Sequence, residues 1–200
     1  MASTLFKQIL VKVKQCFASG DLFGQIRTQK GNTQTAERIY ISCIRKILNE
    51  MGLTFKEAGS QQPYDFRINI PDSEDILKLE AKKTDSFSIY FNDTCPTEEA
   101  YYMIFFTGKF YKTKDSIPAR IIGVNGSVFT AKCPWIKDYA TELSILKEKY
   151  RHMSGNMSVY PRPTYKSDIR FLIEAPKKRF IQKRKFRIVG DKSLPMKKDT

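Results

Sequence analysis

The sequence predicts a mixed α/β fold in which helices flank a central mixed β-sheet. Two N-terminal segments repeat their apolar residues at the 3.6-residue spacing of helices, whereas later segments alternate apolar and polar residues with the period of strands. The run from Tyr101 to Phe106 is apolar and aromatic, as a buried central strand would be. A chain of 200 residues with 41% hydrophobic content can bury a sizeable core, so we expect one domain over residues 1–200.

The N-terminal part is predicted to contain two helices. The first spans residues 3–18 and carries lysines between its apolar positions, a basic side that we interpret as a solvated face rather than a phosphate or membrane contact. A polar, glycine-containing connection from Ser19 to Thr33 follows, either mobile or ordered by a ligand. The second helix runs from Thr35 to Met51 and stops at Gly52. Glu37 falls in its first predicted turn, where a carboxylate complements the helix dipole even without another role.

The other elements follow from alternation, turn residues and helical spacing. Asn125-Gly126 is one of the stronger hairpin signals in a single sequence, so we expect it to join strands 119–124 and 127–130. A third helix is expected from Pro134 to Met153, and its apolar side carries Trp135, Tyr139, Leu143, Leu146 and Tyr150. The remaining predicted strands are Leu53–Ala58, Ser86–Phe91, Asp168–Glu174 and 178–189.

The chain is strongly basic. It has 35 lysine and arginine residues against 21 aspartate and glutamate residues, a formal net charge of +14 at pH 7 and a pI near 9.6. This balance favours an acidic polymer or surface as partner, namely DNA, RNA or an anionic membrane. The most concentrated positive segment is C-terminal, about residues 177–200, with ten basic and two acidic residues.

Cysteine usage and hydropathy indicate the compartment. The four cysteines are widely spaced and form no CxxC pair, which favours free thiols over a zinc cluster or a disulfide framework. No stretch approaches the roughly 20 apolar residues of a membrane span, and lysines interrupt the first apolar run, unlike in a signal peptide. We therefore expect a soluble intracellular protein that contacts no membrane, located in the cytoplasm or wherever DNA is accessible, and not secreted.

The stretch from Pro63 to Lys82 is predicted to be a hairpin that pairs two carboxylates. Its apolar faces consist of Tyr64, Phe66, Ile68 and Ile70 in the first run and Leu77, Leu79 and Ala81 in the second. Asp65 lies on the polar face of the first run, and Glu80 and Lys82 lie on that of the second. If the polar connection 71–75 sets the right register, Asp65 and Glu80 stand side by side. Because like charges across a sheet are destabilising, this arrangement indicates a cation between them.

Two carboxylates beside a lysine suit magnesium-dependent phosphate chemistry. Mg²⁺ prefers oxygen ligands and keeps several waters, so Asp65 and Glu80 can bind it, with the main-chain carbonyl of Ala81 as a further ligand. One ion or two would lower the pKa of a bound water and balance charge on the phosphate. Lys82 could orient or deprotonate that water and neutralise developing charge. The same spacing fits a polar strand face with a surface ion pair, and spacing alone leaves both interpretations open.

The order of these features carries a family resemblance. In sequence they are a helix with an early glutamate, Gly52, a short strand, Gly59-Ser60, Pro63-Tyr64-Asp65 and Leu79-Glu80-Ala81-Lys82, within about residues 33–93. This order resembles the PD-(D/E)xK nuclease superfamily, which includes restriction endonucleases and archaeal Holliday-junction resolvases. The resemblance implies a restriction-endonuclease-like fold in which Asp65 and Glu80 bind Mg²⁺, Lys82 assists the water and Glu37 contacts the metal through water. Mn²⁺ is expected to substitute for Mg²⁺.

The sequence departs from the family pattern in one respect. The first motif reads Pro-Tyr-Asp instead of Pro-Asp, a spacing that the superfamily tolerates. A literal Pro71-Asp72 occurs eight residues before Glu80, but we expect it in the turn and not on a strand facing Glu80. His152 is the only histidine, too few for the nucleases that use histidine-bound metals or paired histidines. No GxxxxGK[ST] loop that would bind a nucleoside triphosphate is present.

The rest of the chain supplies candidates for DNA contact. The run Phe91–Pro96, which includes Asn92 and Asp93, resembles the layout of type II restriction enzymes more than that of the compact resolvases. In the segment 159–166 the prolines stiffen the chain, so Arg162 could bond guanine edges and Tyr165 could pack on sugars or bases, with Lys166 beside them. A proline-rich surface loop explains that segment equally well. The C-terminal basic residues, among them Lys183, Arg184 and Lys185, are expected to contact phosphate.

Together these features predict a Mg²⁺-dependent endonuclease that hydrolyses phosphodiester bonds of double-stranded DNA. We expect a sequence-specific enzyme most similar to a type II restriction endonuclease, and a homodimer if its target is palindromic. One alternative is a structure-selective nuclease that acts on Holliday junctions or in repair. The other is a basic nucleic-acid-binding protein without activity, which the joint retention of Asp65, Glu80 and Lys82 argues against.

Overall fold

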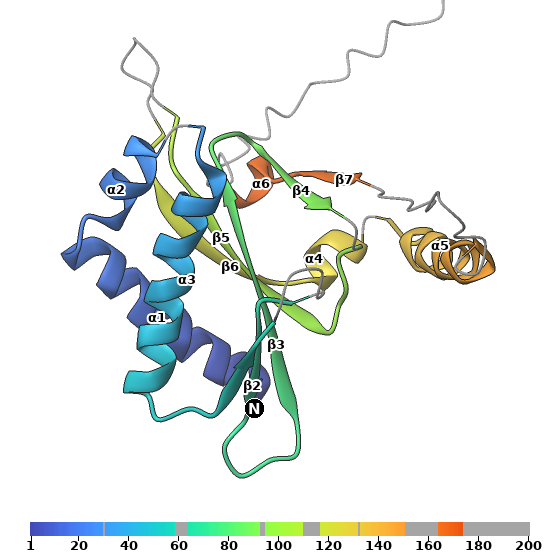
Figure 1. Cartoon of the computed structure of the whole chain (residues 1–200), viewed down its shortest axis with the longest axis horizontal. Coiled ribbons are helices and arrows are strands. Elements are labelled where there is room, and N and C mark those ends of the chain that lie inside the picture. The colour runs from blue at the N-terminus through green and yellow to red at the C-terminus, as the bar shows by residue number, and fades with distance from the viewer. Residues whose placement is uncertain are drawn as a thin grey trace, which may run out of the picture.

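A five-stranded mixed sheet forms the centre of the molecule, with strand order β1-β2-β3-β5-β6 (Figure 1). The computed structural model describes residues 1–29, 31–58, 64–92, 95–109, 117–131, 133–150 and 164–173. The strands of the sheet are β1 (Phe55–Glu57), β2 (Phe66–Asn69), β3 (Ile76–Thr84), β5 (Ala100–Phe106) and β6 (Arg120–Asn125). β3 and β5 run parallel, whereas the pairs β1–β2, β2–β3 and β5–β6 are antiparallel. The predicted mixed α/β class with a helix-flanked sheet is confirmed.

Three helices cover one face of this sheet (Figure 1). They are α1 (Ala2–Ser19), α2 (Leu22–Thr28) and α3 (Thr33–Glu50). Their apolar sides form a core with β2, β3 and β5. In this core the residues that recur every 3.6 positions in the helices pack against every second residue of the strands. Phe105 is fully buried at the middle of this core, with its ring 4.8 Å from that of Tyr40 and 4.9 Å from that of Phe17.

A two-stranded ribbon and two short helices cover the opposite face. The ribbon pairs β4 (Ser88–Asn92) with β7 (Thr164–Asp168), and the helices are α4 (Ser127–Thr130) and α6 (Arg170–Ile173). Their buried residues form a second core with the alternate residues of β5, centred on Phe91 and Phe106. The second core thus joins segments from the middle and the far end of the described chain.

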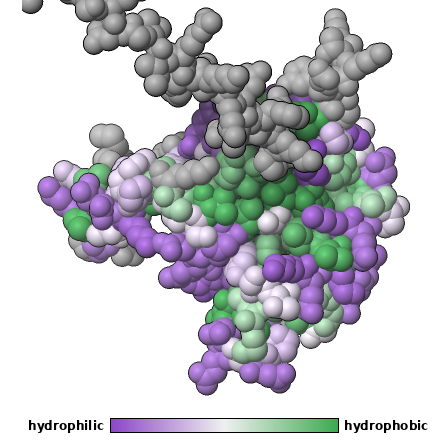
Figure 2. Space-filling model, turned by 180° about the vertical axis from the view of Figure 1, so that it is seen from behind, coloured by the Kyte–Doolittle hydropathy of each residue, from purple (hydrophilic) through white to green (hydrophobic). Residues whose placement is uncertain are grey.

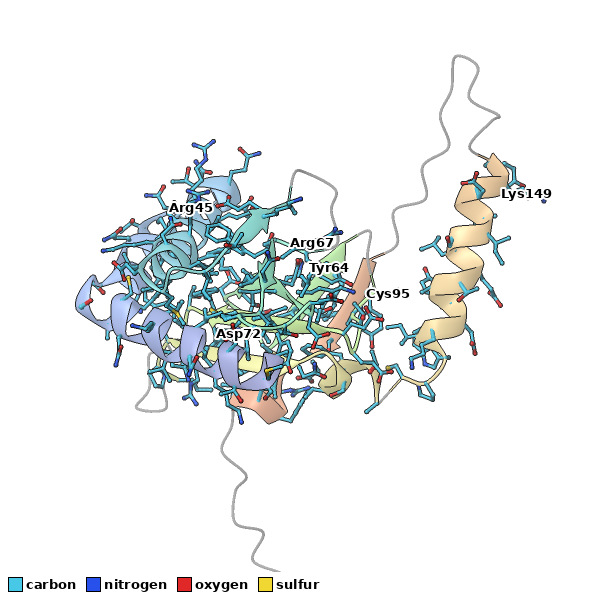
Figure 3. The ribbon with its side chains drawn as sticks, turned by 90° about the horizontal axis from the view of Figure 1, so that it is seen from below. Arg45, Tyr64, Arg67, Asp72, Cys95 and Lys149 are labelled. Carbon is cyan, nitrogen blue, oxygen red and sulfur yellow. The ribbon has the colours of Figure 1, made fainter. Side chains whose placement is uncertain are left out.

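The helix α5 (Ile136–Tyr150) projects away from the body, to which its N-terminal end is attached (Figures 1 and 3). Its predicted apolar side is largely open, since Trp135 is 52% exposed and Leu146 is 45% exposed. In the view from behind, α5 stands at the left while hydrophobic residues gather toward the middle of the body (Figure 2). The helical spacing predicted this helix correctly but did not predict whether its apolar side is covered.

The connection between the parallel strands β3 and β5 contains a strand instead of the usual crossover helix. After β3 ends at Thr84, the chain enters β4, which leaves the central sheet and pairs with β7. Thr84 holds this exit, because its hydroxyl donates to the Ser88 carbonyl oxygen at 2.7 Å and accepts from the Ser86 N–H at 3.0 Å. The ribbon therefore begins immediately after the strand that carries Glu80 and Lys82.

The N-terminal predictions are confirmed with two corrections. Helix α3 begins at Thr33 instead of Thr35, because the Asn32 side chain caps it by accepting from the Thr35 N–H at 3.0 Å, so Glu37 lies beyond the first turn. The connection from Ser19 to Thr33 contains the helix α2, which starts where the Asp21 side chain accepts from the Gly24 N–H. In both cases an Asn or Asp side chain sets the start of the helix.

The hairpin predicted at Asn125-Gly126 is wrong, because β6 ends at Asn125 and residues 127–130 form α4. The Asn125 side chain explains the difference. Its Oδ1 accepts from the Ser127 N–H at 3.0 Å, and its Nδ2 donates to the Glu98 carbonyl at 2.8 Å. Asparagine here starts a helix and binds a neighbouring loop instead of forming a two-residue strand turn.

The strand predicted from Asp168 to Glu174 is also wrong. β7 ends at Asp168, and α6 follows from Arg170. At this point the Asp168 Oδ1 accepts from the Arg170 N–H at 2.9 Å, a local side-chain-to-backbone bond that competes with strand pairing. The strand predicted over 178–189 lies outside the described residues, as does the basic segment from about 177 to 200. None of the described helices combines the length and the apolar composition that a membrane crossing needs.

We expect Phe105→Ala to lower the free energy of unfolding by about 3–5 kcal/mol, because it opens a cavity among the rings of Tyr40 and Phe17. Ile76→Ala is the matched control, since Ile76 lies in the same sheet but is 50% exposed, and it should cost less than about 1 kcal/mol. Urea denaturation of both variants measures the difference. Equal losses of stability would contradict the described core.

Candidate active site

The β2–β3 pairing brings Asp65 beside Glu80. The register sets Phe66 opposite Leu79, and one position further along it places Asp65 next to Glu80. The Ala81 N–H donates to Asp65 Oδ2 at 2.6 Å, which fixes the Asp65 carboxylate against β3. The structure therefore brings together the two carboxylates that the period of two predicted.

The main-chain carbonyl of Ala81 leaves β3 on the same edge. In an extended strand the N–H and C=O of one residue point to the same side. Because the Ala81 N–H points to Asp65, its carbonyl also points toward Asp65, beyond the last β2 residue that pairs with β3. The Asp65 carboxylate and the Ala81 carbonyl oxygen thus lie at the same edge of β3, next to the residue that carries Glu80.

Lys82 lies on the same face of β3 as Glu80 and forms an ion pair with it. The side chain of Lys82 is 22% exposed and that of Glu80 is 11% exposed. The Lys82 ammonium also lies 5.8 Å from the centre of the Phe91 ring in β4. The lysine is thereby held between the carboxylate beside it and the aromatic side of the ribbon, with part of its surface open to solvent.

Burial makes both carboxyls hold their protons more tightly than usual. Burial raises the pKa of Glu80 to about 7, the Asp65 charge adds to this rise, and Lys82 opposes it. Burial likewise raises the pKa of Asp65, against the lowering effects of the Ala81 N–H and Lys82. Both carboxyls are therefore harder to ionise in the folded chain than in water.

The chain bends before β2, and this bend separates Tyr64 from the face that alternation assigned to it. Phe66, Ile68 and Ile70 pack under α1 and α3 as predicted, but Tyr64 packs in the second core, on the side of Glu80 and Lys82. The prediction for Tyr64 is therefore wrong, because strict alternation starts only after the bend at Asp65. Tyr64 also lines a pocket of about 740 Å³ beside the start of α5, together with Cys95 (Figure 3).

Glu37 acts on the site from α3 without joining the carboxylate pair. Its charge raises the pKa of Asp65 and also that of the buried Tyr40, so it faces the same region. Within the described ranges, however, no group of three or more histidine, cysteine, aspartate or glutamate side chains is placed to hold a metal ion. The structure thus brings Asp65, Glu80 and Ala81 together but leaves Glu37 outside that set.

The donor set fits an oxygen-liganded divalent cation. Asp65 and Glu80 would hold Mg²⁺ or Mn²⁺ through carboxylate oxygens and Ala81 through its carbonyl, which leaves the remaining positions to water. The buried like charges that such a cation would neutralise support this fit. Without a cation, the Lys82 ammonium balances the charge of Glu80 through their ion pair.

The predicted DNA-contact residues fall into three groups. Lys166 is exposed on β7, and Asn92 is the last residue of β4. Tyr165 is partly buried instead, since its hydroxyl donates to the Cys133 sulfur at 3.0 Å and its ring lies 5.8 Å from that of Phe91. The residues that lie outside the described part of the chain are Asp93, Arg162, Lys183, Arg184 and Lys185.

Two tyrosines near the site were not predicted to belong to it. Tyr102 pairs with Glu80 across the parallel strands, and its hydroxyl accepts from the Thr97 N–H at 3.1 Å. Tyr40 comes from the apolar side of α3, where helical spacing assigned it to the core. The Asp65, Glu80 and Glu37 charges raise its pKa further above what burial alone gives. The sequence signal for this was the hydroxyl of Tyr40 within an otherwise apolar stripe, because a buried tyrosine hydroxyl usually has a polar neighbour.

Comparison of the chain with protein-family models, with curated protein sequences and with solved structures found no match.

In the absence of metal, we expect the free energy of unfolding to fall as the pH rises from the ordinary pKa of a glutamate, 4.5, to the pKa of Glu80 in the folded protein, about 7. The folded chain keeps this proton up to about pH 7, whereas the unfolded chain releases it near its ordinary value of 4.5. Because the folded state binds more protons between these values, ionisation there costs up to roughly 3 kcal/mol. Urea denaturation in EDTA at several pH values, for wild type and Glu80→Gln, measures this cost. A difference between the two proteins that does not change with pH would contradict it.

Proposed function

We propose that this chain is a divalent-metal-dependent endonuclease that hydrolyses phosphodiester bonds of double-stranded DNA. The observation that carries the proposal is a pair of carboxylates, the buried Glu80 on β3 and the half-buried Asp65 just before β2, with Lys82 paired to Glu80. Neighbouring carboxylates repel each other, and Lys82 pairs with Glu80 only, so a divalent cation would offset the repulsion that remains. In phosphodiester hydrolysis a divalent cation activates the attacking water. A lysine beside it stabilises the negative charge that develops on the phosphate.

Each residue has a definite part in this chemistry. Mg²⁺, or Mn²⁺ in its place, would supply an activated water and neutralise charge on the phosphate. Asp65 and Glu80 would bind the cation, and the Ala81 N–H keeps Asp65 in the binding position. Lys82 would orient the attacking water and stabilise negative charge that develops on the phosphate oxygens. The Phe91 ring below Lys82 keeps its ammonium close to the carboxylates.

The proposal includes the family and the substrate. The helix, the short strand β1 and the β2–β3 pair occur in the order of the PD-(D/E)xK resemblance, so we propose a restriction-endonuclease-like fold. The net charge of +14 supports DNA as the substrate. Within this proposal the enzyme is a sequence-specific one of type II, and it is a homodimer if its target is palindromic. A structure-selective junction or repair nuclease is the second candidate.

We expect Asp65→Asn and Glu80→Gln to lower cleavage of plasmid DNA in Mg²⁺ by at least about 100-fold, because each removes several kcal/mol of transition-state stabilisation. Asp72→Asn is the matched control. Asp72 is exposed in the β2–β3 turn and has a positive φ of 58°, which asparagine also tolerates, so its variant should cut like wild type.

The same assay distinguishes the candidates. The wild-type protein is incubated with plasmid and with a four-way junction, in Mg²⁺ and in EDTA. Discrete fragments support the restriction enzyme, whereas cutting of the junction alone supports the structure-selective nuclease. Absence of any cutting in Mg²⁺ would refute the enzyme, and wild-type rates in the Asp65 or Glu80 variants would refute the site.

We expect Glu37→Gln to lower cleavage by less than about tenfold, because Glu37 acts on Asp65 through its charge and does not belong to the carboxylate pair. Its effect should shrink at high salt, which screens charges that are exposed. Single-turnover rates at two salt concentrations measure this. A loss as large as that of Glu80→Gln would make Glu37 a direct metal ligand.

A further inference from the structure

The β4–β7 ribbon has one side built into the protein and one side facing outward. Successive residues of a strand point to opposite sides. Ile89 and Phe91 of β4 are each 1% exposed and point into the second core, so the residue between them, Tyr90, points outward. Tyr90 pairs directly with Lys166 of β7.

The inner side of the ribbon touches the candidate active site. The Phe91 ring lies 5.8 Å from the Lys82 ammonium and 5.5 Å from the ring of Tyr102, which pairs with Glu80. Only the thickness of the ribbon separates its outer side from Lys82. DNA bound to that outer side would therefore lie close to the phosphate that the site would cut. The position of the ribbon therefore suits a contact with the nucleotides beside that phosphate.

The outer side presents a tyrosine and a lysine as one unit. Tyr90 is 49% exposed, and the Lys166 ammonium lies 5.9 Å from the centre of its ring. This contact between a cation and an aromatic face orients the lysine before any ligand arrives. On the next outward pair, Ser88 stands opposite Asp168, whose carboxylate accepts hydrogen bonds from the Arg170 guanidinium. Hydrogen bonds from Arg170, and to a lesser degree the Lys166 charge, lower the pKa of Asp168, so two basic side chains stand against one carboxylate here.

The shape and charge of this surface fit one nucleic-acid groove. The major groove of B-form DNA is about 12 Å wide and admits a two-stranded ribbon, whereas the major groove of an RNA duplex is too deep and narrow for side chains to read. A lysine there donates to O6 and N7 of guanine, and an aromatic side chain contacts the methyl group of thymine. A chain with a net charge of +14 is drawn to the DNA that carries these groups.

We propose that the outer side of the β4–β7 ribbon enters the major groove of double-stranded DNA beside the cut bond and reads its bases through Tyr90 and Lys166. This inference rests on the proposed function and adds the groove and the residues that choose the site. Tyr165, on the inner side, supports the ribbon and does not touch DNA.

The test is selection of binding sites from a random double-stranded DNA library in EDTA, where no cleavage occurs. The wild-type protein should enrich one sequence, and substitution of 7-deazaguanine for guanine in that sequence should weaken binding at least tenfold, since it removes N7 from the major groove. Lys166→Gln and Tyr90→Ala should each reduce the preference for the enriched sequence over a random one by about 10- to 100-fold. Lys46→Gln is the matched control, because Lys46 is an exposed lysine on α3, and it should keep the preference.

Several outcomes would overturn the inference. These are an unchanged preference in both ribbon variants, equal weakening on all sequences, no effect of 7-deazaguanine, and tighter binding of an RNA duplex than of DNA. Cleavage in Mg²⁺ is measured separately on the same proteins. Sequence-specific binding without cleavage would refute the proposed function alone, and cleavage with unchanged preference in the variants would refute the ribbon alone.

Discussion

The hydrogen bond from the Ala81 N–H to Asp65 is the interaction on which the candidate site depends. It holds the half-buried carboxylate of Asp65 beside the buried one of Glu80, a placement that electrostatic repulsion opposes. It also fixes the direction of the Ala81 carbonyl, because both groups leave the strand on one edge. Without this bond, the bend before β2 would leave the Asp65 side chain free to turn to solvent, and the two acids would relax apart. The register of a single strand pair thus determines which oxygen atoms meet.

The central sheet divides its two faces between stability and chemistry. Under α1 and α3 the side chains are apolar and closely packed around Phe105, so this face supplies most of the buried surface. On the other face, β3 alternates to place Glu80 and Lys82 among the aromatic residues of the second core. Aromatic neighbours remove water from the charged groups and so raise the pKa of Glu80. The face under the helices thus packs the apolar side chains of β3, and the face under the ribbon holds its charged ones.

Local patterns predicted the carboxylate pair because every step of that prediction lies within one hairpin. The period of two and a short polar connection are enough to bring Asp65 to Glu80. The same reasoning failed where a side chain bonds to the backbone two residues further on: Asn125 accepts from the Ser127 N–H, and Asp168 accepts from the Arg170 N–H. Alternation also did not predict that β4 pairs with β7, because the pattern of one strand does not identify a partner strand that is distant in the chain. Nor could alternation place Tyr64, whose side follows from the bend at Asp65.

The ribbon and the carboxylate pair differ in how much of the chain must be ordered to form them. The β2–β3 hairpin closes a short loop, so its residues can meet early in folding and at small entropic cost. β5, β6, α4 and α5 lie between β4 and β7 in the chain, so the pairing of these two strands closes a much longer loop at a larger entropic cost. Long-range pairings of this kind open more easily than the core that they cover. A partly opened molecule would therefore keep its pair of acids in register while it lost the surface beside them.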